Sequence, residues 1–333
     1  MSGTKCDYNL IKITSFPRVH ITLIGMSNKG YRINGSIGFS ISAPRIEISF
    51  QASDHIEIMD KREVKFIDQE KVKLQHLLSE VVSKFDLKKK IKCIINSKAL
   101  PHYGLGSNTA IYMSCVEALF LINNVEYDQN NLLISSKRGG TSGIGINTYF
   151  DGGFIFDVGI SNEKQSLIPS SIADRNGKMP LVIHKCKLPD WKIGICIPKY
   201  IPNKSEKEEV NFFRAFCPID KKSIESILYE AVYGITSSII ENDYDTFCKS
   251  VNTIQHTKWK SLERSLYGKD LIKLENKIKR LGADCIGMSS LGPTLFFTGK
   301  NVNEIIDRIS KDMPETICFN TSFNNKKRII DYD

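Results

Sequence analysis

The sequence lacks any apolar run long enough to cross a bilayer. The longest candidate, residues 110–122, is interrupted by Ser114 and Glu117, and it falls short of the roughly 20 apolar residues that a membrane-spanning helix needs. The first residues, MSGTKCDYNLIK, also lack the apolar segment of a secretory signal. We therefore expect a protein that has no contact with membranes, is not exported and works in the cytoplasm.

Common metal and redox motifs are missing as well. The 9 cysteines are odd in number, no two have the C-x-x-C spacing, and the 6 histidines form no H-E-x-x-H pattern. Cys93 and Cys196 lie in apolar segments, where a reduced thiol packs as a small hydrophobe. These features disfavour a dedicated zinc site and favour a reducing compartment.

The net charge of +9 does not mark a nucleic-acid tract. Lysines are spread over the whole chain, and the densest run, residues 88–92, leads into a predicted strand. A solvated basic surface is therefore favoured over a nucleic-acid site, and we expect no nucleic-acid partner. A small polyanionic substrate fits the charge equally well.

Strand and helix patterns are mixed along the chain, which predicts an α+β fold of two domains. We assign residues 1–165 to the first domain and 166–333 to the second, with a polar boundary loop at 163–180 and a charged loop at 203–209. Strands are predicted at 18–24, 37–41, 45–50, 92–96, 151–157, 181–186, 192–197, 287–299 and 316–320. Helices are predicted at 69–85, 108–121, 222–240, 244–265, 271–281 and 302–311.

The segment PHYGLGSNTA, residues 101–110, has the character of a phosphate-binding loop. Gly104 and Gly106 let the backbone approach a ligand closely, and the helix that follows offers free N–H groups to an anion. Ser107 and Thr109 add hydroxyl groups. An ordinary strand–turn–helix with a serine cap explains the loop equally well, and the spacing matches neither G-x-x-x-x-G-K-[ST] nor G-x-G-x-x-G.

The loop resembles the pattern P-x-x-x-G-L-G-S-S-x-A of the GHMP kinase superfamily. Two further segments, GTSGIGINTYFDGG at 140–153 and GMSSLGPTLFF at 287–297, resemble the second and third motifs of the same superfamily. The matching loop positions are Pro101, Gly104, Leu105, Gly106, Ser107 and Ala110. This resemblance implies a ribosomal-S5-like N-terminal domain and a ferredoxin-like C-terminal domain.

One departure from the superfamily is informative. Mevalonate-type kinases carry S-G-x-D in the second motif, and the aspartate accepts the proton of the substrate hydroxyl. Here Ser142-Gly143-Ile144 is followed by Gly145, which cannot accept a proton. An ATP-dependent small-molecule kinase is therefore an alternative function and not the main hypothesis. A non-catalytic GHMP-like binding protein is a second alternative.

Nearly the whole chain is similar to the β-ribofuranosylaminobenzene (or hydroxybenzene) 5′-phosphate synthases of methanopterin biosynthesis. The segments that carry this similarity are PRVHITL, HYGLGSNTA, RGGTSGIG, DGGFIFD, EVNFFRAFCPI and GMSSLGPT. The resemblance implies that phosphoribosyl pyrophosphate and 4-aminobenzoate or 4-hydroxybenzoate react with loss of CO2 and pyrophosphate. It also implies a requirement for Mg²⁺ and a homodimer.

The resemblance also selects the candidate site residues. Arg18 and His20 lie two apart on a predicted strand and should face one side. They are the proposed catalytic pair, although a surface arginine and a core histidine explain them too. The residues assigned to phosphate or substrate are His102, Gly104, Leu105, Gly106, Ser107, Asn108, Thr109, Arg138, Gly140, Thr141, Ser142, Gly143, Arg214, Ser289, Ser290 and Thr294. Asp151 and Asp157 are the candidate Mg²⁺ ligands, and each is equally well explained as a turn residue.

Overall fold

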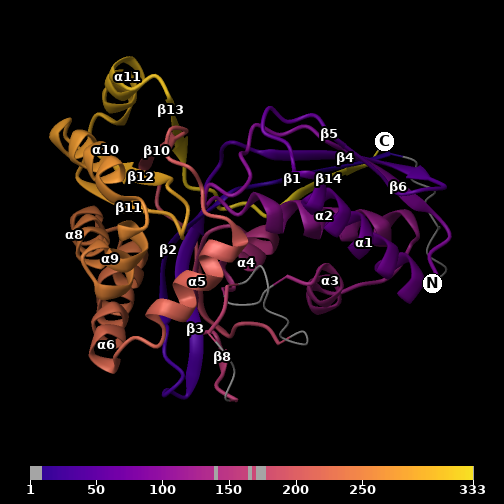
Figure 1. The fold of residues 1–333 in the computed structure, drawn as a ribbon, viewed down its shortest axis with the longest axis horizontal. Coiled ribbons are helices and arrows are strands. Elements are labelled where there is room, and N and C mark those ends of the chain that lie inside the picture. The colour runs from indigo at the N-terminus through magenta and orange to yellow at the C-terminus, as the bar shows by residue number, and fades with distance from the viewer. Residues whose placement is uncertain (1–9, 139–141, 164–166, 170–177, 333) are drawn as a thin grey trace.

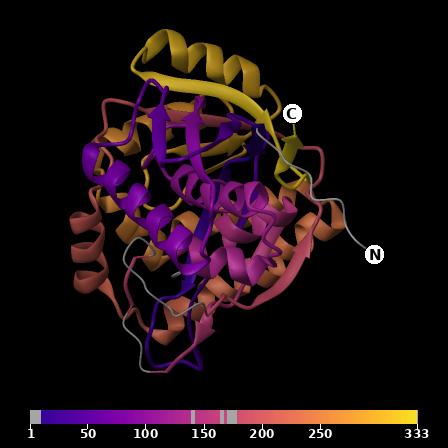
Figure 2. The ribbon, with the colours of Figure 1, turned by 90° about the vertical axis from the view of Figure 1, so that its right-hand side faces the viewer.

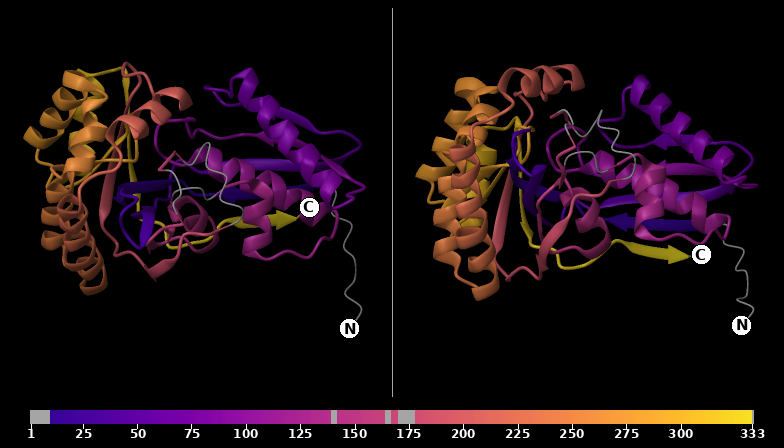
Figure 3. Two further views of the ribbon diagram at one scale, coloured as in Figure 1. Left: turned by 60° about the horizontal axis from the view of Figure 1, so that its bottom comes forward. Right: turned by 90° about the horizontal axis from the view of Figure 1, so that it is seen from below.

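A computed structural model describes residues 10–138, 142–163, 167–169 and 178–332 of the chain. The molecule is elongated and mixes helices with three sheets, which confirms the α+β prediction (Figure 1). In the views of Figure 3, the helices of the C-terminal half form a block at one end, and the N-terminal sheet with its helices forms the other end.

The first sheet has the strand order β14-β1-β4-β6-β5 and is covered by helices. Its strands are β1 (Leu10–Ser15), β4 (Ile46–Ser53), β5 (Glu57–Asp60), β6 (Lys90–Ile95) and β14 (Ile329–Tyr332). The helices on this side are α1 (Asp68–Lys84), α2 (Ser107–Ile122) and α3 (Gln129–Ser136). Nearly every residue of α2 is buried, so this helix and the loop before it are held rigidly.

The second sheet runs β2-β3-β7-β9, with β8 pairing to β3. Its strands are β2 (Arg18–Gly25), β3 (Arg32–Ser40), β7 (Phe154–Asp157), β8 (Ile160–Ser161) and β9 (Val182–Cys186), and α4 (Ile144–Asp151) packs on it. Two strands from beyond residue 166, β9 and β14, pair with strands of the N-terminal half. The division at residue 165 therefore separates segments that share sheets.

The third sheet has the order β11-β12-β10-β13 and carries the C-terminal helices. Its strands are β10 (Lys192–Pro198), β11 (Cys285–Met288), β12 (Leu295–Thr298) and β13 (Thr316–Ser322). The helices are α6 (Lys221–Tyr229), η1 (Glu230–Thr236), α7 (Ser237–Glu241), α8 (Tyr244–Gln255), α9 (Lys258–Ser265), α10 (Gly268–Arg280) and α11 (Val302–Asp312). Figure 2 shows α11 lying beside β13 at the top of the molecule.

Several predictions about the elements are wrong or incomplete. The predicted strand 287–299 is two strands, β11 and β12, and the predicted helix 222–240 consists of α6, η1 and α7. No element is predicted at β1, β5, α3 or α4. Residues 203–209 are not all loop, because α5 (Glu206–Phe216) begins within them at a Ser205–Glu208 capping box. The predicted helix 244–265 is two helices, α8 and α9, and β14 was not predicted at all. The S-x-x-E spacing before an apolar run was the overlooked signal for α5.

Candidate active site

Two glycine loops from distant parts of the chain lie side by side at the start of α2. A Cβ atom on Gly104 would lie 2.3 Å from the backbone oxygen of Ser289, and the φ angle of Gly104 is +83°. Only glycine can adopt this positive φ angle and come this close to the backbone oxygen without strain. The loop of residues 101–106 therefore touches the loop of residues 289–294 directly.

Arg18, the first residue of β2, reaches into the same loop. Its Nη1 donates a hydrogen bond to Gly104 O at 2.5 Å, and a Cβ atom on Gly106 would lie 2.9 Å from Arg18 Cγ. Its Nε is buried without a hydrogen-bond partner. Burial lowers the pKa of Arg18 to about 10, an effect that the charge of Glu209 partly offsets. At neutral pH this guanidinium is a cation with an unused donor.

His20 follows on the same strand and is tied to the C-terminal loop. Its backbone N–H donates to Ser289 Oγ at 3.0 Å, and its carbonyl accepts from the Ser290 N–H at 3.0 Å. Ser289 Oγ in turn donates to Gly104 O at 2.7 Å. Both His20 Nδ1 and Thr294 Oγ1 are buried without a partner. Among the described residues these two atoms have no partner, and a ligand group that reached either of them would complete its hydrogen bonding.

The imidazole of His20 is held neutral. Burial lowers its pKa well below the ordinary value, and the positive charges of Arg18 and Lys260 lower it further. A neutral imidazole can orient a ligand by donating or accepting one hydrogen bond, but it adds no positive charge. The cation beside the glycine loops is therefore Arg18.

Gly145 in α4 faces this arginine. A Cβ atom on Gly145 would lie 3.5 Å from Thr109 Cγ2 and 3.9 Å from Arg18 Nε. These are ordinary contact distances, so a side chain has room at this position. An acid there would neutralise Arg18, whereas glycine leaves the arginine available to an external anion.

A cleft of about 930 Å³ opens next to the first loop. Its walls come from α1, the start of α2, residues 136–138 and the first turn of α5. Lining residues include Glu70, His102, Asn108, Tyr112, Arg138 and Glu206. Figure 1 places α5 near the middle of the molecule, and its first residues, 206–208, line the cleft.

Polar side chains at the mouth of α2 form one cluster. His102 Nε2 contacts Glu70 Oε1, and Asn108 Nδ2 lies 3.2 Å from His102 Nε2 and 3.4 Å from Glu70 Oε1. Burial alone would raise the pKa of Glu70, but hydrogen bonding and the charge of His102 outweigh it and lower that pKa. His102 and Asn108 thus line the cleft in a fixed arrangement.

Arg138 is a cation that lines the cleft. Its guanidinium carbon lies 3.8 Å from the ring centroid of Tyr112, and among the described residues its buried Nε has no hydrogen-bond partner. Burial lowers the pKa of Arg138, and the interactions with Tyr112 and Glu70 offset part of this change. Arg138 therefore gives the cleft an unused donor, which suits an anionic group of a substrate.

Several candidate residues support the loops from inside. Leu105 and Ser107 are buried, and Ser107 Oγ donates to Leu100 O at 3.1 Å. Thr109 lies in the first turn of α2 beside Gly145. These side chains shape the loop from its buried side.

The second glycine motif is partly described. Ser142 Oγ lies 2.8 Å from Ser36 Oγ, and the Gly143 N–H donates to Asp157 Oδ2 at 3.1 Å. Gly140 and Thr141 lie outside the described residues. Arg214 is exposed in the last turn of α5, without a hydrogen bond or ion pair in the part of the chain that the structure describes.

Neither candidate metal ligand is free. Asp151 Oδ2 pairs with Lys185 Nζ at 2.9 Å. Asp157 is buried and accepts hydrogen bonds from Ser36, Gly143 and Gly159. Within the described ranges, no three His, Cys, Asp or Glu side chains are placed to hold a metal ion. These carboxylates therefore do not fit a protein-held Mg²⁺ site.

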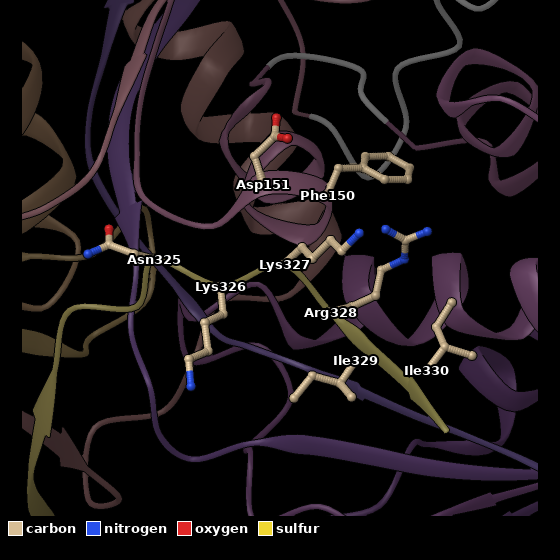
Figure 4. Close-up of a pocket in the computed structure, with 8 residues that line it drawn as sticks. All are labelled: Phe150, Asp151, Asn325, Lys326, Lys327, Arg328, Ile329 and Ile330. Atoms are coloured by element: carbon tan, nitrogen blue, oxygen red, sulfur yellow. The ribbon is translucent and has the colours of Figure 1, made fainter. Parts of the chain in front are cut away.

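A second, shallow hollow lies away from the glycine loops, between the end of α4 and residues 325–330 (Figure 4). Its most prominent cation, Arg328, is bound to the buried Glu117. Asp151, which also lines this hollow, is paired with Lys185. Among the helices of the described chain, none is long and apolar enough to span a bilayer.

The fold is that of the GHMP kinase superfamily. A homoserine kinase from Cytophaga hutchinsonii superposes with a TM-score of 0.66 at 16% identity, covering 97% of this chain and 98% of its own. The L. major mevalonate kinase gives a TM-score of 0.68 at 12% identity, with 95% and 96% covered. At these identities the likeness establishes the fold alone.

Sequence relatives define the family within that fold. The β-ribofuranosylphenol 5′-phosphate synthase of Methanothermobacter thermautotrophicus is 30% identical over 283 residues, or 84% of this chain and 85% of that protein. The synthase of the same name from Archaeoglobus fulgidus is 30% identical over 294 residues, 86% and 87% of the two chains. No family profile matches the chain. The chain belongs to the β-ribofuranosylphenol 5′-phosphate synthase family, as its motifs predicted.

Proposed function

We propose that this protein joins the ribosyl 5-phosphate of phosphoribosyl pyrophosphate to the ring of 4-hydroxybenzoate or 4-aminobenzoate, with release of CO2 and pyrophosphate. The observation that carries the proposal is the environment of Arg18, a half-buried cation between two glycine loops, with a buried Nε that has no partner among the described residues and with no acid at Gly145. The relatives are named for a phenol product, which favours 4-hydroxybenzoate.

The chemistry suits a site without a base at position 145. As the bond from C1 of ribose to the pyrophosphate breaks, negative charge grows on the leaving group. Backbone N–H groups of the loop and the start of α2 stabilise that charge. The ring carbon that bears the carboxylate attacks C1, and no proton leaves that carbon because CO2 departs from it.

Within this proposal Arg18 binds the benzoate carboxylate and His20 orients the ring. Arg138 binds an anionic group of the donor, with His102 and Asn108 beside it. Arginine must position the carboxylate without overstabilising it, since binding of the ground state alone gives no acceleration. Bound Mg²⁺ would offset negative charge on the pyrophosphate of the donor, although Asp151 and Asp157 are engaged with other groups and are not free to hold it.

Purified protein incubated with phosphoribosyl pyrophosphate and each benzoate tests the proposal. Pyrophosphate and CO2 should form in equal amounts, and neither should form when the benzoate is omitted. Formation of ADP from ATP that depends on a small alcohol would instead establish a kinase. Binding of ligands without turnover would establish a non-catalytic binding protein.

The proposal includes a homodimer in the cytoplasm, as the family resemblance implies. Sedimentation of the purified protein tests the dimer directly, because a monomer would sediment with a mass near 37.7 kDa.

A further inference from the structure

Lys260 is a buried cation behind the loop of residues 289–294 that the proposed reaction has not used. It lies on α9, which packs against β2, and its side chain is completely buried. Its Nζ donates to Glu263 Oε2 at 2.5 Å and to Met288 O at 2.8 Å. Glu263 is also buried, and its other oxygen accepts from Trp259 Nε1 at 2.8 Å. The lysine therefore joins a buried ion pair to the last residue of β11, directly before the loop.

The loop that follows Met288 makes contacts that arrange the site. Ser289 Oγ accepts from the His20 N–H at 3.0 Å and donates to Gly104 O at 2.7 Å. The N–H of the next residue, Ser290, donates to His20 O at 3.0 Å. A shift of this loop would therefore move the backbone of His20 and the first glycine loop together.

The backbone of this loop needs support from its surroundings. Ser290 has a φ angle of +57°, in the left-handed region that serine seldom adopts. Such a conformation persists where the surrounding structure fixes it. Gln255 Oε1 accepts from the Met288 N–H at 3.1 Å, and the Tyr267 hydroxyl group donates to Leu291 O. With the buried lysine, these side chains hold the loop from the side of the C-terminal helices.

We propose that Lys260 is a positioning residue for the synthase reaction. Through the carbonyl group of Met288 it holds the following loop in place beside His20. This inference rests on the proposed function, in which His20 orients the ring of the benzoate. Stability alone gives little reason for an ion pair at this place, since apolar residues of similar volume are often as stable as a buried pair. The lysine does not touch the substrate and acts only through the loop.

Removal of both charges separates a positioning lysine from a purely structural ion pair. In Lys260→Met the carboxylate of Glu263 stays buried without its cation, so the protein should lose stability in either case. In Lys260→Met/Glu263→Gln no charge is left unpaired, and the amide oxygen can still accept from Trp259 Nε1. Most of the stability should return in this double variant, but Met288 O still lacks the donor that held it.

The first test is to measure kcat, KM and the urea midpoint of unfolding for the wild type, the single and double variants, and Lys258→Met. Lys258 is the matched control because it lies on the same helix and forms an exposed ion pair with Asp220 at 2.8 Å. We expect the double variant to unfold near the wild-type urea concentration and yet to lose about 100-fold in kcat, with smaller changes in KM. Lys258→Met should keep kcat within about twofold of the wild type.

A double-mutant cycle with Ser289→Ala tests whether the lysine acts through the loop. In Ser289→Ala the hydroxyl group that contacts His20 and Gly104 is already absent. Lys260→Met/Glu263→Gln should then lower kcat by less than about fivefold in this background. Equal losses in the two backgrounds, or a double variant with both normal stability and normal kcat, would overturn the inference and leave Lys260 with a structural role only.

Amide hydrogen exchange gives a readout that does not need turnover. In Lys260→Met/Glu263→Gln the Ser290 N–H should exchange at least about tenfold faster than in the wild type, while the amides of α2 keep their rates. Unchanged exchange at Ser290 would also overturn the inference. If the folded wild type turns over neither benzoate, the proposed function itself fails, and the exchange rates still decide whether Lys260 holds the loop.

Discussion

Arg18 and Arg328 are both drawn into the protein, but their partners differ. Arg18 donates to a single carbonyl oxygen, and its Nε is unpartnered. Arg328 forms a salt bridge with the fully buried Glu117, with Nε 3.0 Å and 2.9 Å from the two carboxylate oxygens. Tyr127 and Tyr149 complete that network by donating to Glu117 at 2.7 Å and 2.6 Å.

The pKa values of the two arginines are therefore shifted in opposite directions. At Arg18 burial lowers the pKa, because the charge of Glu209 compensates for only part of the lost hydration. At Arg328 burial acts in the same direction, but the hydrogen bonds and charge of Glu117 outweigh it and raise the pKa. Arg328, which is paired with Glu117, links the start of β14 to α2. Arg18, which lies between the glycine loops without such a pair, is available to bind an external anion.

The largest expected effect is on catalysis at Arg18. Arg18→Leu should lower kcat/KM at least about 10³-fold, or about 4 kcal/mol, because a buried cation that binds a reacting anion is lost. The KM for the benzoate should rise much more than that for phosphoribosyl pyrophosphate. Arg280→Leu, at an exposed position in α10, is the control. Unchanged KM values would remove Arg18 from the benzoate site.

The counterpart change at Arg328 should affect stability. Arg328→Leu leaves Glu117 buried without its cation, which we expect to lower the free energy of unfolding by about 4 kcal/mol. Activity per folded molecule should stay within about twofold. Urea denaturation of this variant and of the double variant Glu117→Leu/Arg328→Leu measures the effect. A single variant as stable as the double one would show that the pair is not coupled.

Asp157 lies between these two cases, because its carboxylate accepts hydrogen bonds but forms no ion pair in the part of the chain that the structure describes. Burial is the largest influence on its pKa and raises it from the ordinary 3.8 to about 6, against the opposing hydrogen bonds. Its contribution to stability should be complete below about pH 4 and disappear as the pH rises through 6, a change of up to about 3 kcal/mol. Asp157→Asn should lack this dependence. If urea denaturation gave free energies of unfolding that change with pH in the same way for both proteins, this prediction would be wrong.

The smallest effect should come from introducing, near Arg18, the aspartate that mevalonate-type kinases carry in the second motif. In Gly145→Asp the new carboxylate would lie close to Arg18 Nε and pair with it, since the Cβ position is 3.9 Å away. We expect about a tenfold loss of synthase activity and a higher KM for the benzoate. Gly145→Asn is the neutral control of nearly equal size. Equal losses in both variants would show that bulk, and not charge, is responsible.

Much of the local structure was predictable from the sequence. The apolar residues after the first glycine loop predicted a helix at 108–121, and α2 spans Ser107–Ile122. Alternation in RIEISF predicted the strand that became β4. Such signals are readable because a helix or strand depends on neighbours a few residues away. The three glycine motifs also identified the family, since their residue types and order are properties of the sequence.

Only the tertiary structure decided which charges are paired. Arg328 meets Glu117 across 211 positions of the chain, and the loop of Ser289 meets Gly104 across 185. No local pattern marks such contacts, so the sequence does not show that Arg328 is paired with a carboxylate and Arg18 is not. The sequence by itself determined the motifs and the family, and the packing of distant segments decided which side chains remain free, because hydration and pairing depend on proximity in space.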